Sequence, residues 1–170
     1  MKSFQLLLLF TLTIVSNLLG QSKIKSSTID KTETQKNKLV GTWRLIEFSD
    51  LDSATLTWTY PYGKNPKGYF TYTQTGIVNL NISSETPFKI SKDSAKIYSI
   101  NLLNWVDNYS VGYFGTYSVD FNKSIVTHHV KGGSLPWYID TDQQRPFILK
   151  GDTLIIGNNK TWKRILVKEN

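Results

Sequence analysis

Two stretches of the chain, residues 113–119 and 124–131, alternate apolar or aromatic side chains with smaller or more polar ones. This period of two, together with the aromatic and β-branched content of both stretches, predicts a pair of β-strands. The four residues between them, Asp120 to Lys123, are typical of a tight turn, because Asp and Asn side chains bond to nearby backbone groups. We therefore predict a β-hairpin over residues 113–131.

The position of this turn determines which residues of the hairpin face each other. It predicts that Gly115 lies opposite His128, so that no side chain stands across from the imidazole. The predicted pairs are Val119 with Ser124, Tyr117 with Val126, Gly115 with His128 and Tyr113 with Val130. Because successive side chains in a strand point to opposite faces, His128 and His129 must lie on different sides. The side of His128 is otherwise apolar, and its expected members are Tyr113, Tyr117, Val119, Val126, His128 and Val130.

Further short strands are predicted on both sides of this hairpin, over residues 39–48, 69–73, 77–82, 145–150, 153–156 and 160–167. Residues 94–107 have a helical period, and Ser91 or Ser94 is suited to cap a short helix or lid there. Residues 132–144 are expected to form a long irregular loop. About eight short strands with turns between them, and without alternating helices, predict an all-β fold, an antiparallel barrel or sandwich.

The first 20 residues have the pattern of a secretory signal peptide, with Lys2 before an apolar run that begins at Leu6. Small and polar residues after that run predict cleavage near Gly20, and the mature protein is expected to be secreted or periplasmic. An uncleaved membrane anchor is the alternative, but polar residues interrupt the run and it barely reaches spanning length. Residues 21–37 have almost no apolar content and are predicted to be a disordered linker, and residues 38–170 are the folded domain.

Composition excludes several kinds of site. The chain has no cysteine, which excludes disulfides, thiolate metal sites and cysteine nucleophiles. Its formal charge is +7, but the lysines are scattered, whereas a nucleic-acid site clusters its charge. Two adjacent strand histidines cannot chelate one ion, and the chain has no Gly-x-Ser-x-Gly motif. We therefore predict no catalytic residue, metal site, cofactor or nucleic-acid partner, and a membrane contact only through the leader.

An ordered set of short motifs extends over residues 39–167. It consists of Gly41-Thr42-Trp43, Tyr60-Pro61-Tyr62-Gly63, Tyr72, Tyr113-Phe114-Gly115-Thr116-Tyr117, Val126-Thr127-His128-His129-Val130, Gln144-Arg145-Pro146-Phe147 and Trp162-x-Arg164. In these motifs the chain resembles the bacterial and fungal lipocalin-like domain. The resemblance implies a lipocalin-like (calycin) barrel around a cavity for a small, mostly apolar molecule. It also implies that Arg164 covers Trp43 through a cation–π contact. The loop Leu135–Tyr138 departs from the family, because it lacks the Asn that usually stands beside the Trp.

Six residues are predicted to bind the ligand: His128, Tyr113, Tyr117, Arg145, Tyr62 and Trp137. His128 is suited to orient a carboxylate, a phenol or a carbonyl, and its alternative role is a buried histidine satisfied by a neighbouring tyrosine. Arg145 either reaches inwards as an anion partner or ties down the loop that ends at Gln144, for example by pairing with Asp140 or Asp142. The aromatic loops of Tyr62 and Trp137 either form the mouth of the cavity or plug the barrel end.

These residues support three functions. The first is a secreted, monomeric binding protein for a small apolar or aromatic molecule. The second is a small barrel enzyme of the cyclase or isomerase type, in which His128 acts as a general acid or base. The third is a structural or surface interaction module, which a barrel filled by packed Tyr and Trp side chains favours.

Overall fold

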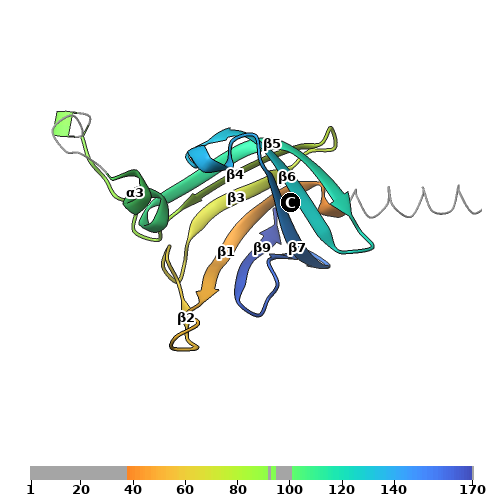
Figure 1. Cartoon of the computed structure of the whole chain (residues 1–170), viewed down its shortest axis with the longest axis horizontal. Helices are drawn as coiled ribbons and strands as arrows, with labels where there is room; N and C mark the ends of the chain where they lie inside the picture. Colours follow the sequence, from red (N-terminus) through yellow and green to blue (C-terminus); the bar gives the residue numbers. More distant parts are fainter. Residues whose placement is uncertain (1–37, 92, 95–100, 170) are drawn as a thin grey trace, which may run out of the picture. The chain divides into compact units, whose positions relative to one another are not determined.

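The computed structural model describes residues 38–91, 93–94 and 101–169, and the predicted signal peptide and linker lie outside this part of the chain. The residues from Leu39 onwards form one compact unit. Its elements are β1 (Gly41–Leu51), β2 (Trp58–Thr59), β3 (Lys67–Tyr72), β4 (Ile77–Ser83), α3 (Leu102–Asn108), β5 (Ser110–Asp120), β6 (Ile125–Gly133), the short 3-10 helix η1 (Pro136–Tyr138), β7 (Asp142–Lys150), β8 (Thr153–Ile156) and β9 (Trp162–Lys168) (Figure 1).

The strands form a closed antiparallel barrel, which confirms the predicted fold class. From β3 to β9, each strand pairs with the one that follows it in the chain. Strand β1 pairs with β3 on one side and with β9 on the other, so eight strands close into a ring. The two-residue β2 pairs only with the end of β1. Closure leaves no long strand edge unpaired and encloses the inward-facing side chains of all eight strands.

The predicted central hairpin is β5 and β6, but its register differs from the prediction. Asp120 still pairs with Ile125, so the turn begins one residue later than expected, at Phe121. Asp120 is the last paired residue of β5, and its carboxylate accepts a hydrogen bond from the backbone N–H of Lys123 in the turn at 3.1 Å. The consequence is that Tyr117, and not Gly115, lies opposite His128. The predicted facing is confirmed, because the apolar side is buried or half-buried and His129 lies on the other side.

Gly115 therefore does not make room for the imidazole, as the predicted register implied. It pairs with Val130 beside a bulge that separates it from Phe114. A Cβ at this position would lie 2.0 Å from the backbone oxygen of His129, far inside van der Waals contact. The glycine is required because the backbone of the neighbouring strand approaches so closely at the bulge.

Two further boundaries differ from the prediction. The irregular segment between β6 and β7 is shorter than expected, since β6 extends to Gly133 and β7 begins at Asp142. The predicted helix is present as α3, but its N-cap is Asn101, whose side chain accepts from the Asn104 backbone N–H at 3.1 Å. Residues 95–100 of the predicted helical segment lie outside the described residues.

The two ends of the barrel differ in packing. Large side chains fill one end completely, and those with no solvent exposure include Trp43, Tyr72, Val78, Leu154 and Leu166. The indole N–H of Trp43 donates to the backbone oxygen of Leu39 at 2.8 Å, which satisfies its only polar atom. This end is therefore a conventional hydrophobic core.

The expected contact between Trp43 and Arg164 is absent, and the prediction was wrong. Antiparallel pairing places Trp43 beside Lys168, whose Nζ lies 5.3 Å from the indole centroid. Arg164 pairs instead with Phe48. On β9, Arg164 stands four residues before Lys168, which is a separation of about 13 Å at 3.3 Å per residue. The arginine of the last strand thus belongs to the opposite end of the barrel from Trp43.

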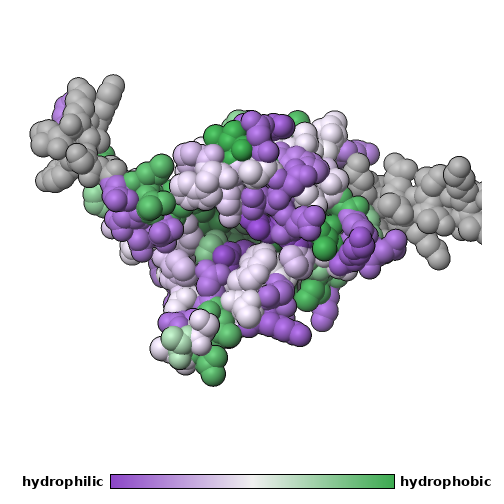
Figure 2. All heavy atoms as spheres, viewed as in Figure 1, coloured by the Kyte–Doolittle hydropathy of each residue, from purple (hydrophilic) through white to green (hydrophobic). Residues whose placement is uncertain are grey.

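Hydrophilic residues cover most of the face shown in Figure 2, and hydrophobic residues appear there in small groups. Within residues 38–91, 93–94 and 101–169, no helix combines the length and the apolar content needed to cross a bilayer.

Candidate functional site

The end of the barrel away from Trp43 contains a cavity of about 380 Å³. Inward-facing residues of the strands form its wall, while α3, η1 and the loop around Tyr62 form its rim. The apolar lining consists of Phe48, Phe70, Leu80, Ile82, Val106, Val111, Leu135 and Ile156. The polar or aromatic lining consists of Tyr62, Asp107, Tyr113, His128, Trp137, Tyr138, Arg145, Trp162 and Arg164. The cavity is therefore mainly apolar and aromatic, with a few polar atoms at defined places.

His128 lies between the cavity and the packed core, and its side chain is completely buried. Its Nε2 is 2.9 Å from the hydroxyl of Tyr72, and its Nδ1 is 2.7 Å from the hydroxyl of Tyr113. Both ring nitrogens are thus hydrogen-bonded to tyrosines, which agrees with the predicted alternative of a buried histidine satisfied by a neighbouring tyrosine. Alternation on the barrel strands brings the three side chains to the same interior layer.

Burial keeps this cluster uncharged. It lowers the pKa of His128 to about 3, with smaller contributions from the charges of Arg145 and His129. Burial also raises the pKa of Tyr113 to about 12, an effect that the nearby Arg145 opposes, and it raises the pKa of Tyr72 well above its ordinary value. The imidazole is neutral and the two phenols are protonated near neutral pH. A histidine with this pKa is a weak general base, because catalysis favours a pKa near the working pH.

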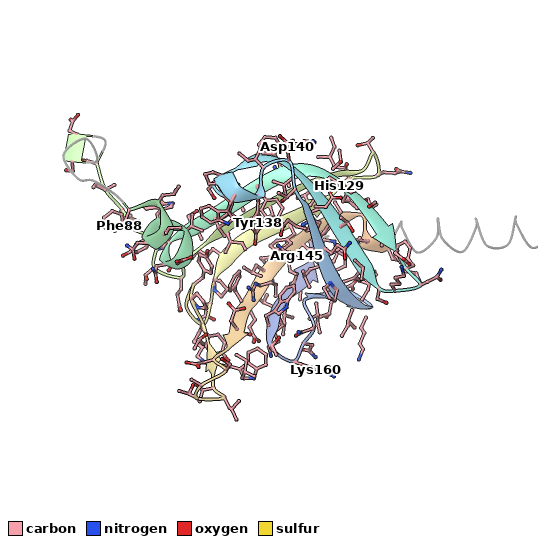
Figure 3. The ribbon with its side chains drawn as sticks, in the orientation of Figure 1. Phe88, His129, Tyr138, Asp140, Arg145 and Lys160 are labelled. Atoms are coloured by element: carbon pink, nitrogen blue, oxygen red, sulfur yellow. The ribbon has the colours of Figure 1, made fainter. Side chains whose placement is uncertain are left out.

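Arg145 is directed into the barrel from β7, opposite Val126 of β6 (Figure 3). Its Nη2 donates to Gln143 Oε1 at 3.1 Å and, more weakly, to the hydroxyl of Tyr138 at 3.5 Å. Its guanidinium lies 5.8 Å from the ring centroids of Tyr138 and of Trp162.

The two carboxylates considered as partners of Arg145 bind other residues. Asp140 pairs with Lys131 at 2.9 Å, and Asp142 pairs with His129 at 2.6 Å. Side chains alternate along β7, so Asp142 and Arg145, three residues apart, point to opposite faces of the sheet. Arg145 therefore points inwards, and its bond to Tyr138 also holds the loop before β7, so features of both predicted roles are present.

Tyr62 is a fixed part of the wall, being only 4% exposed. Its hydroxyl donates to the backbone oxygen of Val106 in α3, and its ring meets Phe48 edge to face at 4.6 Å. Its loop is held by Glu85, whose Oε2 accepts from the backbone N–H of Lys64 at 2.9 Å. Gly63 allows this turn, because its φ of +84° suits glycine and a Cβ would lie 2.6 Å from the same carboxylate oxygen.

Five of the six predicted ligand-binding residues line the cavity: His128, Tyr113, Arg145, Tyr62 and Trp137. Trp137 stands at the rim with 49% of its surface exposed. Tyr117 is the exception, because its ring packs on Tyr72 at 5.0 Å and its hydroxyl donates to the Thr73 backbone oxygen at 2.8 Å. It lies four residues beyond Tyr113 on β5, which places it in the packed end.

Residues 40–169, nearly the whole described domain, match the family model of the lipocalin-like domain. The chain belongs to the lipocalin-like domain family. A comparison with curated proteins gives no match. Every strand of the barrel falls within the matched residues, so the family membership and the observed closure agree.

Sequence reasoning missed several cavity residues of this lipocalin-like domain. Tyr72 was part of the motif set but not of the predicted site, although its hydroxyl forms a hydrogen bond with Nε2 of His128. Tyr138, Trp162 and Arg164 also line the cavity. Alternation identifies inward-facing residues on each strand, but it does not show which end of the barrel is packed and which is open.

The outer surface of the lipocalin-like domain carries a serine, a histidine and a carboxylate in a row. Ser118 Oγ is 3.0 Å from Nε2 of His129, whose Nδ1 is 2.6 Å from Asp142 Oδ1. The three lie on adjacent strands β5, β6 and β7, and Ser118 lines neither the cavity nor two other, more open pockets among the described residues. A nucleophilic serine needs a substrate pocket and an oxyanion hole, so we interpret this row as a surface hydrogen-bond chain.

Metal ligands are not clustered in the part of the chain that the structure describes. No group of three or more histidine, aspartate or glutamate side chains there is arranged to hold an ion.

Proposed function

We propose that this lipocalin-like domain binds a small, mostly apolar or aromatic molecule inside the barrel. The observation that carries the proposal is the cavity of about 380 Å³ at one barrel end, above a fully packed core. Small-molecule sites typically have volumes of about 300–1,000 Å³ and mainly apolar walls with a few placed polar groups. The rings of Tyr62, Trp137 and Trp162 offer large rigid surfaces to an aromatic ligand.

The proposed partner is a small molecule and not a nucleic acid, and the proposed working unit is a monomer. The molecule enters past Trp137 and α3, the exposed parts of the rim. The packed end, with Trp43 and Tyr72 completely buried, offers no comparable route.

An enzyme that uses His128 as a general acid or base is the weaker proposal. Both nitrogens of His128 are engaged by phenols, and no substrate atom can reach either one without displacing Tyr72 or Tyr113. General acid–base catalysis requires a group within hydrogen-bond reach of the proton that it transfers. Tyr113, which lies at the wall, is better placed than His128 to touch a ligand.

Binding is tested with the neutral fluorescent probe N-phenyl-1-naphthylamine, whose emission increases in apolar surroundings. Val111→Phe adds volume inside the cavity, whereas Ile77→Phe adds it on the outside of β4, where Ile77 is 49% exposed. We expect Val111→Phe to weaken binding of the probe roughly tenfold and Ile77→Phe to leave it nearly unchanged. Equal effects of the two variants, or no binding by the parent protein, would contradict the proposal.

We further propose that the domain is exported by a signal peptide over residues 1–20. The pattern of Lys2, the apolar run from Leu6 and the small and polar exit before Gly20 supports this. The intact mass of protein from its native host decides the question. A mass that includes Met1 to Gly20 would rule out cleavage at this position.

A further inference from the structure

The chain has three arginines, and they differ in how their charge is balanced. Arg44 pairs with Glu169 on the outside of β1, with Nε and Oε1 2.6 Å apart. Arg164 pairs with Asp50, and its Nη1 also donates to the backbone oxygen of Ser49. Among the described residues, no carboxylate lies within ion-pair distance of Arg145.

Arg145 is therefore a cavity-facing cation with neutral partners. Nη2 of Arg145 donates to the amide of Gln143 and to the phenol of Tyr138, and a side-chain hydrogen bond from the guanidinium to the Tyr113 hydroxyl opposes the rise that burial causes in the pKa of Tyr113. These neutral partners use only part of the five N–H groups of Arg145, which leaves donors for a further acceptor. A partly buried charge without a counter-ion is unfavourable, and the planar guanidinium fork matches the two oxygens of a carboxylate.

The hydrogen bonds of His128 place a second donor at the wall. The hydroxyl of Tyr72 has no solvent exposure, and Nε2 of His128 is its partner. It must donate to that nitrogen, because otherwise its own hydrogen would be buried without an acceptor. The neutral ring then carries its hydrogen on Nδ1 and donates to the oxygen of Tyr113. The hydroxyl hydrogen of Tyr113 is thereby left for the cavity that Tyr113 lines.

We propose that the cavity selects a small aromatic or aliphatic molecule with a single carboxylate, held by the guanidinium of Arg145 and the hydroxyl of Tyr113. This rests on the proposed binding function and specifies its ligand class. Tyr72 and His128 are positioning residues, which act only by orienting Tyr113. The rings of Trp137, Tyr138 and Trp162 contact the apolar part of the molecule.

The other charged groups of the cavity favour a monoanion. Arg164 is already neutralised by Asp50, with 2.8 Å between Nη1 and Oδ1. Asp107 lines the cavity from α3 at its exposed rim and repels a second negative charge. A carboxylate with charge −1 satisfies Arg145, while a phosphate monoester brings more charge than the single unpaired guanidinium balances.

The test uses calorimetric titration of carboxylate and carboxamide pairs near neutral pH. The pairs are benzoate with benzamide, 2-naphthoate with 2-naphthamide, and octanoate with octanamide, so each differs in charge but hardly in shape. We expect at least one carboxylate to bind roughly tenfold or more tightly than its amide, as a charge-assisted hydrogen bond predicts. 2-Naphthyl phosphate should bind less tightly than 2-naphthoate.

Two arginine variants separate a local effect from overall charge. Arg145→Met removes the cavity charge and should abolish the preference by weakening only the carboxylate. Arg44→Met removes one charge from the outer surface and should preserve the preference for the carboxylate.

Tyr113→Phe retains Arg145 and should reduce the preference about threefold or more, since it removes one neutral hydrogen bond. This last variant decides the matter if Arg145→Met does not fold.

The possible failures have different meanings. Equal binding of acid and amide by the parent protein would overturn the carboxylate assignment and leave the proposed binding function in place. A preference that survives Arg145→Met or disappears in Arg44→Met, or tighter binding of the phosphate, would also overturn the assignment. If none of the six compounds and not even N-phenyl-1-naphthylamine binds, the proposed binding function itself fails.

Discussion

The guanidinium of Arg164 lies over the ring of Phe48, with its central carbon 3.3 Å from the ring centroid. The same group donates to Asp50 Oδ1 at 2.8 Å, so the charge is neutralised while the ring is held in place. Phe48 in turn meets Tyr62 edge to face, which links β9 and β1 to the rim of the cavity. The arginine of the last strand therefore organises the open end of the barrel.

This arrangement predicts which pair of residues is energetically coupled. In a double-mutant cycle, Arg164→Met and Phe48→Leu should show a coupling of about 0.5–2 kcal/mol, because the cation–π contact is shared. Arg164→Met and Trp43→Phe should be additive within about 0.5 kcal/mol, since these residues lie at opposite ends of the β1–β9 ladder. Denaturant unfolding of the single and double variants measures both values. Coupling of Arg164 to Trp43 but not to Phe48 would contradict the observed register.

The two ends of the barrel also predict different costs for removing a tryptophan. Trp43 is completely buried, so Trp43→Ala should lower the free energy of unfolding by about 3–5 kcal/mol. Trp137 is 49% exposed, and Trp137→Ala should cost about 0.5 kcal/mol or less while weakening ligand binding. Urea unfolding of both variants compares the two costs. Similar losses of stability would show that Trp137 is part of the core.

Much of the fold follows from local pattern. Alternation along 113–130 predicted which side of the hairpin is buried, and His128 and His129 lie on the predicted sides. The turn begins one residue later than predicted, so the partner of each residue shifts by two, because an aspartate that favours turns can also occupy the last ladder position, as Asp120 does. Strand periodicity contains no information that distinguishes these two positions, which depend on the pairing of the whole hairpin.

The site was less predictable, because its residues come together only through closure of the barrel. His128, Tyr113 and Arg145 were recognisable as inward-facing polar groups on strands. Tyr72, 56 positions from His128, becomes its partner only when β3 and β6 face each other across the interior. Arg164 was assigned to Trp43 by family resemblance, and only the β1–β9 register shows that it contacts Phe48.

The buried imidazole predicts a pH dependence of stability. The pKa of His128 is lowered from its ordinary 6.5 to about 3 in the folded protein, mainly by burial. Between these two values the unfolded chain binds a proton that the folded protein does not bind. Stability should therefore fall as the pH decreases below about 6.5, with a slope of up to about 1.4 kcal/mol per pH unit from this group.

Comparison of unfolding free energies at about pH 7 and pH 5 tests this slope. The loss attributable to His128 should be roughly 2 kcal/mol, present in His129→Gln and absent in His128→Gln. If His128→Gln does not fold, NMR of the parent protein should show that the His128 imidazole remains neutral at about pH 5. An imidazole that becomes protonated near pH 6.5 in the folded protein would contradict the burial argument.

The hydrogen bonds around His128 also predict its tautomer. Because the completely buried Tyr72 hydroxyl needs an acceptor, Nε2 should be unprotonated and Nδ1 should carry the hydrogen. Long-range ¹H–¹⁵N correlation spectra distinguish the two ring nitrogens, and His129→Gln leaves a single imidazole to assign.

Tyr72→Phe removes the donor to Nε2 and should lower the unfolding free energy by about 1–3 kcal/mol, since it leaves a buried acceptor unpaired. A hydrogen on Nε2 in the parent protein would mean that Tyr113 donates to His128 and has no hydrogen to offer a ligand. Tyr113→Phe should then leave the preference for carboxylates unchanged, and the proposed contact between Tyr113 and the carboxylate would be overturned.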